Sequence, residues 1–172
     1  MNIEVRYQSR GGNTEGAAEK IAAEFAVTAK PVPEAYTYFG SQLTEYVDVL
    51  FLGGGVYWNQ PHRDLDYYIR QLDPKMVGQI VFFSTNGGFF PHGQSVNHQL
   101  AVLARAHGLT VAEETVQINL YLHGFSLLNG SVLWDRIRLS FWSKKGGNIP
   151  EKQTRQLCDF ADKLGKDLQL TD

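Results

Sequence analysis

Two short segments, residues 47–52 and 79–83, are almost entirely apolar, and they restrict the fold more than any other feature of the sequence. A strand without polar alternation is typical of a parallel sheet that helices cover on both faces. Segments with the apolar spacing of helices alternate with these runs, at residues 17–25, 63–72 and 93–106. The alternation predicts an α/β fold, with a doubly wound parallel sheet, right-handed crossovers and helices on both faces.

Further segments complete the expected sheet. Residues 3–7 form a first strand, a short edge strand is expected within residues 29–46, and a fifth strand opens at residues 109–111. A last helix is expected at residues 150–168, because Pro150 suits a first helical position. A chain of 172 residues is long enough for one domain with a substantial core.

The loop between the first strand and the first helix has the sequence Ser-Arg-Gly-Gly-Asn-Thr. Backbone N–H groups converge at such a helix start, and the helix dipole adds partial positive charge, so the geometry suits an anion. The two glycines let the backbone turn and approach a ligand closely. The loop therefore predicts a phosphate site formed by Ser9, Arg10, Gly11, Gly12, Asn13 and Thr14.

Two common kinds of phosphate loop are excluded. No Gly-Lys-Ser/Thr follows the glycines, so the loop is not a Walker A motif. Gly11, Gly12 and Gly16 do not have the G-x-G-x-x-G spacing of a dinucleotide-binding loop. The alternative interpretation is a helix that Asn13 or Thr14 caps, with no ligand bound.

The loop resembles the signature of the flavodoxin family around its FMN phosphate. That pattern runs from an apolar position and an aromatic residue through Ser or Thr to a small residue, then Thr, then Ala. The matching positions are Val5, Tyr7, Ser9, Gly12, Thr14 and Ala18. Two positions depart from the pattern: Arg6 stands where the family usually has an apolar residue, and Arg10 replaces a small loop residue.

The resemblance covers about residues 1–123 and the last helix. It implies FMN as the cofactor and a flavodoxin-like fold, with a five-stranded parallel sheet of order 2-1-3-4-5 in three α/β/α layers. Three expected strands end in glycine-rich loops, which is where open parallel sheets bind ligands. In the family, the second and third of these loops embrace the isoalloxazine ring. The matching positions are Gly54, Gly55, Val56, Tyr57, Trp58, Ser84, Thr85, Asn86, Gly87, Gly88 and Phe89.

A flavin ring needs aromatic or apolar plates on its faces and polar groups along its rim. Tyr57 and Trp58 offer a plate in one loop, and Phe89 or Phe90 offers one in the other. The alternative is that these aromatic residues pack on their own domain. Asn86 is expected to bond the polar edge of the ring.

Two histidines, His62 and His92, flank these loops. Each is a candidate proton donor to a reduced flavin or a substrate, and the alternative is a helix-start or loop histidine in solvent. Residues 59–63 contain no carboxylate, so a very low redox potential is not expected.

Composition excludes several classes of protein. The net charge of −2 does not indicate a nucleic-acid surface. A single cysteine, Cys158, excludes an internal disulfide and suits a reducing compartment, so a cytoplasmic location is expected. We expect no signal peptide and no membrane-spanning segment. No spacing matches a metal site, and no aspartate ends the third strand, as a phospho-acceptor site requires.

We expect a single domain over residues 1–172, with an additional segment at about residues 124–148. Within that segment, residues 126–141 have apolar residues at helical spacing beside Arg136 and Arg138. Such a basic amphipathic segment could pack on its own domain, form a dimer, or contact a membrane surface or partner.

These features favour an FMN-binding redox protein that transfers electrons between partner proteins or to a small acceptor. One alternative is an FMN-dependent oxidoreductase that acts on a quinone-like or porphyrinogen substrate, although no residue stands out as catalytic. A second alternative is a non-catalytic module that binds a phosphate compound or another protein.

Overall fold

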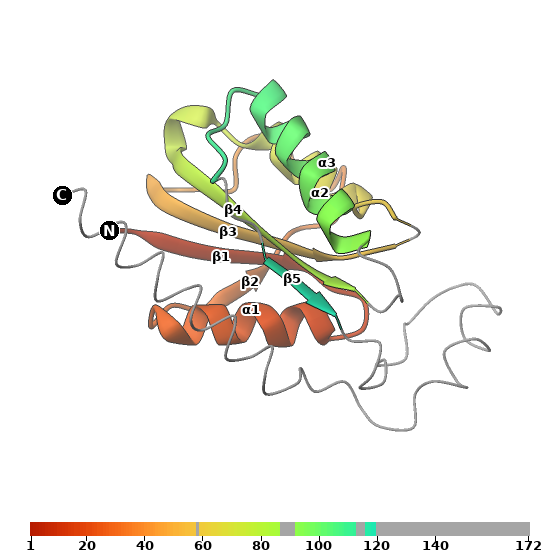
Figure 1. The fold of residues 1–172 in the computed structure, drawn as a ribbon. Helices are drawn as coiled ribbons and strands as arrows, with labels where there is room; N and C mark the ends of the chain where they lie inside the picture. Colours follow the sequence, from red (N-terminus) through yellow and green to blue (C-terminus); the bar gives the residue numbers. More distant parts are fainter. Residues whose placement is uncertain (58, 87–91, 113–115, 120–172) are drawn as a thin grey trace, which may run out of the picture.

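Five parallel strands form the sheet that the apolar runs predict. The computed structural model of the protein describes residues 1–57, 59–86, 92–112 and 116–119. Every neighbouring pair of strands is parallel, and the order β2-β1-β3-β4-β5 confirms the predicted topology (Figure 1). The strands are β1 (Ile3–Gln8), β2 (Ala29–Pro31), β3 (Val47–Gly55), β4 (Val77–Asn86) and β5 (Val116–Asn119).

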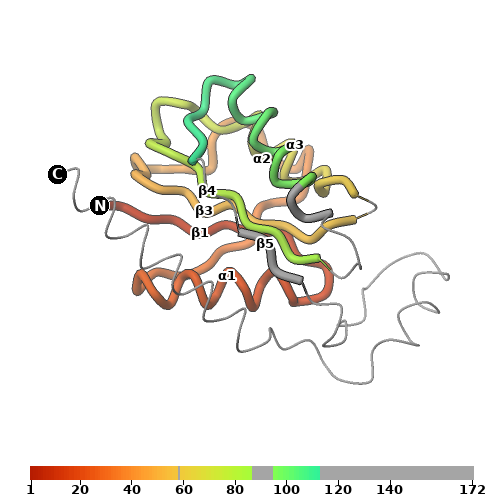
Figure 2. Tube along the Cα trace, viewed as in Figure 1, coloured from red at the N-terminus to blue at the C-terminus, as the bar shows by residue number. Residues whose placement is uncertain are grey.

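Helices cover both faces of this sheet. α1 (Asn13–Glu24) lies on one face, and α2 (Arg63–Gln71) and α3 (His92–Ala106) lie on the other, as Figures 1 and 2 show. The predicted three-layer arrangement is therefore confirmed for the described part of the chain. The last helix expected at residues 150–168 and the segment at 124–148 lie outside the described residues.

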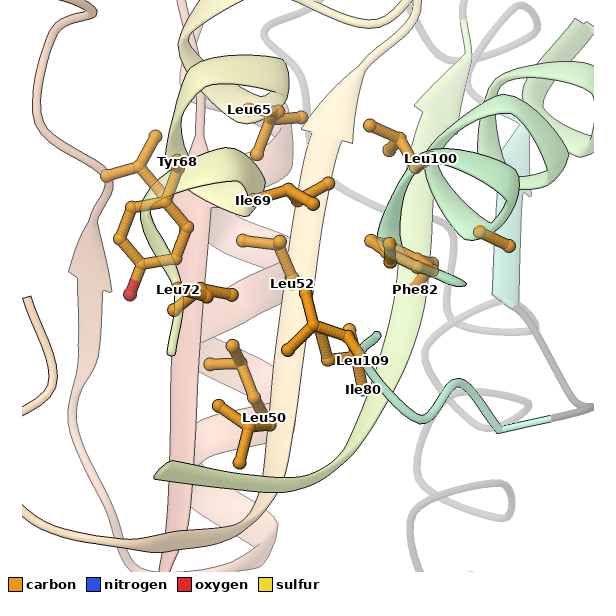
Figure 3. Close-up of a cluster of buried hydrophobic side chains, with 14 of the residues drawn as sticks. Leu50, Leu52, Leu65, Tyr68, Ile69, Leu72, Ile80, Phe82, Leu100 and Leu109 are labelled. Carbon is orange, nitrogen blue, oxygen red and sulfur yellow. The ribbon is translucent and has the colours of Figure 1, made fainter. Parts of the chain in front are cut away.

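Side chains of β3 alternate between the two faces, which explains why residues 47–52 are almost all apolar. Leu52 belongs to a buried cluster with Ile69 of α2 and Leu100 of α3 (Figure 3). Phe51, next to it in the chain, belongs to the cluster on the opposite face together with Ile21 of α1. Full burial of each such side chain stabilises the fold by about 1.5–3 kcal/mol.

The fifth strand begins later than expected. Of residues 109–111, only Val111 pairs with the sheet, in an isolated parallel bridge with Ile80. The continuous pairing with β4 occurs at Val116–Asn119 instead.

The expected edge strand is confirmed as β2, which pairs with the first strand from Val5↔Ala29 to Tyr7↔Pro31. Pro31 is tolerated at this position because an edge strand has no further neighbour that needs its N–H. Among the described residues, no helix is both long and apolar enough to cross a membrane.

Candidate functional site

The carboxyl ends of β1, β3 and β4 lie side by side at one edge of the sheet. Gln8 pairs in register with Gly54, and Gly54 pairs with Ser84. Because the strands are parallel, the segments that follow them leave the sheet at the same edge (Figure 1). Segments that are far apart in the sequence, including residues 9–14, are therefore neighbours at the place where open parallel sheets bind ligands.

The β1–α1 loop has the form of an anion-binding turn. Gly12 is the N-cap residue of α1 and adopts a left-handed conformation, with φ of 84°. Ser9 Oγ accepts a hydrogen bond of 3.0 Å from the backbone N–H of Gly12, which closes the loop. No side chain caps α1, so the structure does not support capping by Asn13 or Thr14. The first N–H groups of a helix have no partner within the helix itself, so those of α1 can bind a ligand.

Thr14 and Thr85 connect this loop to the end of β4. Their hydroxyl oxygens lie 2.7 Å apart, and the side chains are 2% and 5% exposed. In such a pair one hydroxyl donates and the other keeps its own hydrogen for a further acceptor. Tyr7, next to the loop, donates its hydroxyl to Glu15 Oε1 at 2.7 Å.

The polar and glycine residues after the apolar runs belong to the strands themselves. The sequence suggested loops at 53–59 and 84–90, whereas β3 continues to Gly55 and β4 continues to Asn86. A Cβ on Gly53 would lie 2.1 Å from the Phe83 ring, and one on Gly54 would lie 2.3 Å from Leu65 Cδ1. Packing against these two core side chains therefore explains both glycines without a ligand.

Several buried polar atoms at this edge lack a partner within the described part of the chain. Ser84 is 0% exposed and Gln8 is 7% exposed, yet Ser84 Oγ and Gln8 Oε1 accept no hydrogen bond there. Asn13 Oδ1, in the loop, is in the same situation. A buried acceptor left unpaired costs about 1–3 kcal/mol, so a further donor at any of these three atoms would be stabilising.

Tyr57 lies over the end of β3 and faces the β1–α1 loop. Its backbone exchanges hydrogen bonds with Gln60, which makes a tight turn with Asn59 at φ of 61°. A Cβ on Gly55 would lie 2.9 Å from the Tyr57 hydroxyl. The guanidinium carbon of Arg10 lies 5.2 Å from the centre of the Tyr57 ring, within the range of a cation–π contact. Burial raises the pKa of the Tyr57 hydroxyl.

His62 links Arg10 to the start of α2. Its Nε2 lies 2.8 Å from Arg10 Nη2, and its Nδ1 lies 3.0 Å from Asp64 Oδ2. Burial is the main cause that lowers the pKa of His62; Asp64 opposes this shift, and Arg10 and Arg63 add to it. His62 is the N-cap residue of α2, so the expected position at a helix start is confirmed. Its side chain is only 10% exposed, so the part of that alternative that places it in solvent is wrong.

Sequence reasoning missed two residues of this arrangement. Asp64 is buried, approaches His62, and accepts a hydrogen bond of 3.0 Å from the backbone N–H of Ala35. Gln8 was assigned no role, although a polar residue that follows an apolar strand and precedes the glycine loop is a usable signal. The pairing of Arg10 with His62 has no such signal, because 52 residues separate them.

Some of the predicted site residues are among the described residues of the chain, and some are not. Ser9 to Thr14, Gly54 to Tyr57, and Ser84 to Asn86 lie together at the carboxyl edge. Trp58, Gly87, Gly88 and Phe89 lie outside the described residues, as do Phe90 and the side chain of His92. The described residues contain no group of three or more metal-ligating side chains.

No protein-family model matches the sequence, and no curated protein matches it as a relative. Several solved structures are nevertheless similar in fold. Oxidised flavodoxin 1 from Bacillus cereus has a TM-score of 0.64 and 14% identity, covering 96% of this chain and 98% of its own. Oxidised flavodoxin 2 from the same organism has a TM-score of 0.61 and 12% identity, covering 97% of this chain and 99% of its own.

The protein has a flavodoxin-like fold. A third similar structure, a flavoprotein in complex with FMN from Lactobacillus acidophilus, has a TM-score of 0.54 and 18% identity, covering 67% of this chain and 91% of its own. In the flavodoxin-like fold of the present chain, the strand order reverses between β1 and β3. The β1–α1 loop and the Tyr57 turn follow these two strands, so both lie at the topological switch point.

Proposed function

We propose that the protein binds FMN at the carboxyl edge of its sheet and transfers electrons between partner proteins or to a small acceptor. The observation that carries this proposal is the β1–α1 loop, where left-handed Gly12 opens the N-terminus of α1 and Arg10 adds a cation. The FMN complex of the flavoprotein from Lactobacillus acidophilus, a structure of similar fold, supports the choice of ligand.

The loop residues would hold the phosphate. Backbone N–H groups at the start of α1 and the helix dipole favour a dianion there. Ser9, Asn13 and the Thr14–Thr85 hydroxyl pair supply short polar groups beside them. Arg10 gives this loop a positive charge, and a guanidinium binds phosphate through charge-assisted hydrogen bonds.

The unpaired buried acceptors fit the rest of such a cofactor. Gln8 Oε1 and Ser84 Oγ can accept hydrogen bonds from hydroxyl or N–H groups of a bound molecule, and such groups occur along the ribityl chain and at the rim of the flavin ring. Among the described residues, half-buried Tyr57 is the candidate aromatic residue to stack on the flavin ring, since it lies at the same edge of the sheet. Trp58 and Phe89 stay predictions for that role.

Bound FMN would supply one- and two-electron transfer. The protein contributes charge and exclusion of water. Arg10 beside the Tyr57 ring favours a cofactor that gains negative charge on reduction, because opposite charges attract more strongly at a partly buried site. This is consistent with the expectation that the redox potential is not very low.

Calorimetric titration of the purified full chain with FMN and with riboflavin tests the proposal. We expect FMN to bind at least about 10-fold more tightly than riboflavin, since only FMN carries the phosphate that the loop recognises. Stepwise anaerobic photoreduction of the complex then separates one-electron transfer from turnover of a quinone. No heat with either flavin would overturn the proposal.

A further inference from the structure

Arg10 connects the proposed phosphate loop to the segment that precedes α2. Its Nη2 lies 2.8 Å from His62 Nε2, and its guanidinium carbon lies 5.2 Å from the centre of the Tyr57 ring. The rings of Tyr57 and His62 themselves meet edge to face, with centroids 5.5 Å apart. One side chain of the loop is thus held against the two aromatic residues of the neighbouring segment.

The contact has a defined direction because a guanidinium can only donate hydrogen bonds. His62 Nε2 must therefore carry a lone pair, and the single hydrogen of the neutral ring is on Nδ1. Nδ1 lies 3.0 Å from Asp64 Oδ2 and 3.3 Å from the backbone nitrogen of Asp64. With its hydrogen on Nδ1 the ring cannot accept from that N–H, so the nearer carboxylate oxygen accepts the hydrogen. The backbone N–H of Ala35 holds the other carboxylate oxygen at 3.0 Å. Asp64 thereby fixes the form of His62 that can accept from Arg10.

Protonation of His62 would make its contact with Arg10 repulsive. A second ring hydrogen on Nε2 would face the donors of Arg10, and two positive charges would be adjacent. Of the charged groups that face this ring in the described part of the chain, Asp64 favours protonation, whereas Arg10 and Arg63 oppose it. The Tyr57 ring is uncharged at neutral pH, since burial raises its pKa.

We propose that His62 is a positioning residue for phosphate recognition. In its neutral form it holds Arg10 against Tyr57, and in its protonated form it releases Arg10 to an anion bound at residues 9–14. The inference rests on the proposed function, because the anion is the phosphate group of the ligand. Since coupling between two binding sites is reciprocal, an anion in the loop must also make His62 easier to protonate.

The pH dependence of flavin affinity tests this inference. Wild type and His62→Gln are titrated with FMN between about pH 8 and about pH 5.5, a range that spans the ordinary pKa of histidine. The ratio of the two dissociation constants cancels the titration of the phosphate itself. We expect the FMN affinity of wild type, divided by that of His62→Gln, to rise about 5-fold or more from the highest to the lowest pH. His98→Gln, a change at an exposed histidine of α3, should follow wild type.

A second measurement does not depend on how His62→Gln folds. The pKa of His62 in the wild-type chain is measured by NMR, from the chemical shifts of its ring C–H protons as the pH is varied. The measurement is made with and without sulfate, an anion whose own charge does not change in this range. The inference expects sulfate to raise the pKa of His62.

The outcomes of these two measurements are distinguishable. FMN binding with the same pH profile in wild type and His62→Gln, or a His62 pKa that sulfate leaves unchanged, would overturn the inference and leave the proposed function standing. A sulfate effect on His62 without any FMN binding would overturn the proposed function alone.

Discussion

Thr14 and Thr85 share a hydrogen bond of 2.7 Å between their hydroxyl oxygens, which joins the start of α1 to the end of β4 across 71 residues of sequence. Both side chains are buried. The bond therefore holds two of the three site segments together before any ligand binds, and the geometry of the site is in part a property of the fold itself.

Replacing either threonine by valine should destabilise the fold, because valine keeps the shape but leaves the partner hydroxyl buried without a hydrogen bond. We expect each single variant, Thr14→Val or Thr85→Val, to lose about 1–3 kcal/mol of unfolding free energy. The double variant should lose less than the sum of the two, since it leaves no orphaned hydroxyl. Urea unfolding of the four proteins measures this coupling, and strictly additive losses would show that the bond is not formed.

Gly12 and Gly16 form a matched pair for testing the loop. A Cβ would meet nothing within 4 Å at either position, so the two alanine variants should differ because Gly12 has a positive φ and Gly16 does not. Gly12→Ala should cost about 1–2 kcal/mol because L-residues disfavour the left-handed region. Gly16→Ala should stabilise α1 by up to about 1 kcal/mol.

The same two variants separate a role in binding from a role in stability. Gly12→Ala changes the turn that presents backbone N–H groups to the phosphate, so we expect weaker FMN binding in calorimetry. Gly16→Ala should bind FMN as wild type does. Equal affinities for both variants would argue against a phosphate at this loop.

The layers and strand order could be predicted because they depend on features that sequence records locally. The apolar runs at 47–52 and 79–83 indicated strands buried on both faces, and β3 and β4 are buried in this way. The ends of these strands were misjudged for a physical reason. Glycine and polar residues usually mark loops, but Gly53 and Gly54 are in the sheet because Phe83 and Leu65 fill the space of their missing side chains.

The site could be predicted only in part. The loop at residues 9–14 was identified because the glycines and short polar residues that it requires are contiguous. The series of side-chain contacts from Asp64 through His62 to Arg10 was not identified. It depends on how the β3–α2 segment folds back over the loop, and no local sequence pattern specifies that contact. The position of Gln8 between an apolar strand and the glycine loop was a usable signal, but the sequence does not show that its side-chain oxygen is buried without a partner in the described part of the chain.

Gly53 and Gly55, two positions apart in β3, should respond differently to alanine. A Cβ at Gly53 would lie 2.1 Å from the ring of fully buried Phe83, so we expect overpacking to cost about 1–3 kcal/mol in urea unfolding. At Gly55 the nearest atom is the Tyr57 hydroxyl at 2.9 Å, the far end of a side chain at the site. Gly55→Ala should therefore move Tyr57 and change FMN affinity more than stability. A larger loss of stability in Gly55→Ala than in Gly53→Ala would contradict this expectation.

Stability should depend on pH through His62 in a defined direction. Burial lowers its pKa in the folded state below the ordinary value of 6.5. Between these two values the unfolded chain binds more protons than the folded one, so the unfolding free energy rises with pH in that window. The contribution of neutral His62 is complete above about pH 6.5 and is lost as the pH falls.

Urea unfolding of wild type, His62→Gln and His98→Gln at several pH values measures this slope. We expect wild type and His98→Gln to lose stability relative to His62→Gln as the pH falls, because glutamine has no proton to gain. Sulfate should flatten the slope, since an anion at residues 9–14 brings the folded-state pKa of His62 back toward its unfolded value and narrows the window. A slope that persists in His62→Gln would assign the pH dependence to another group.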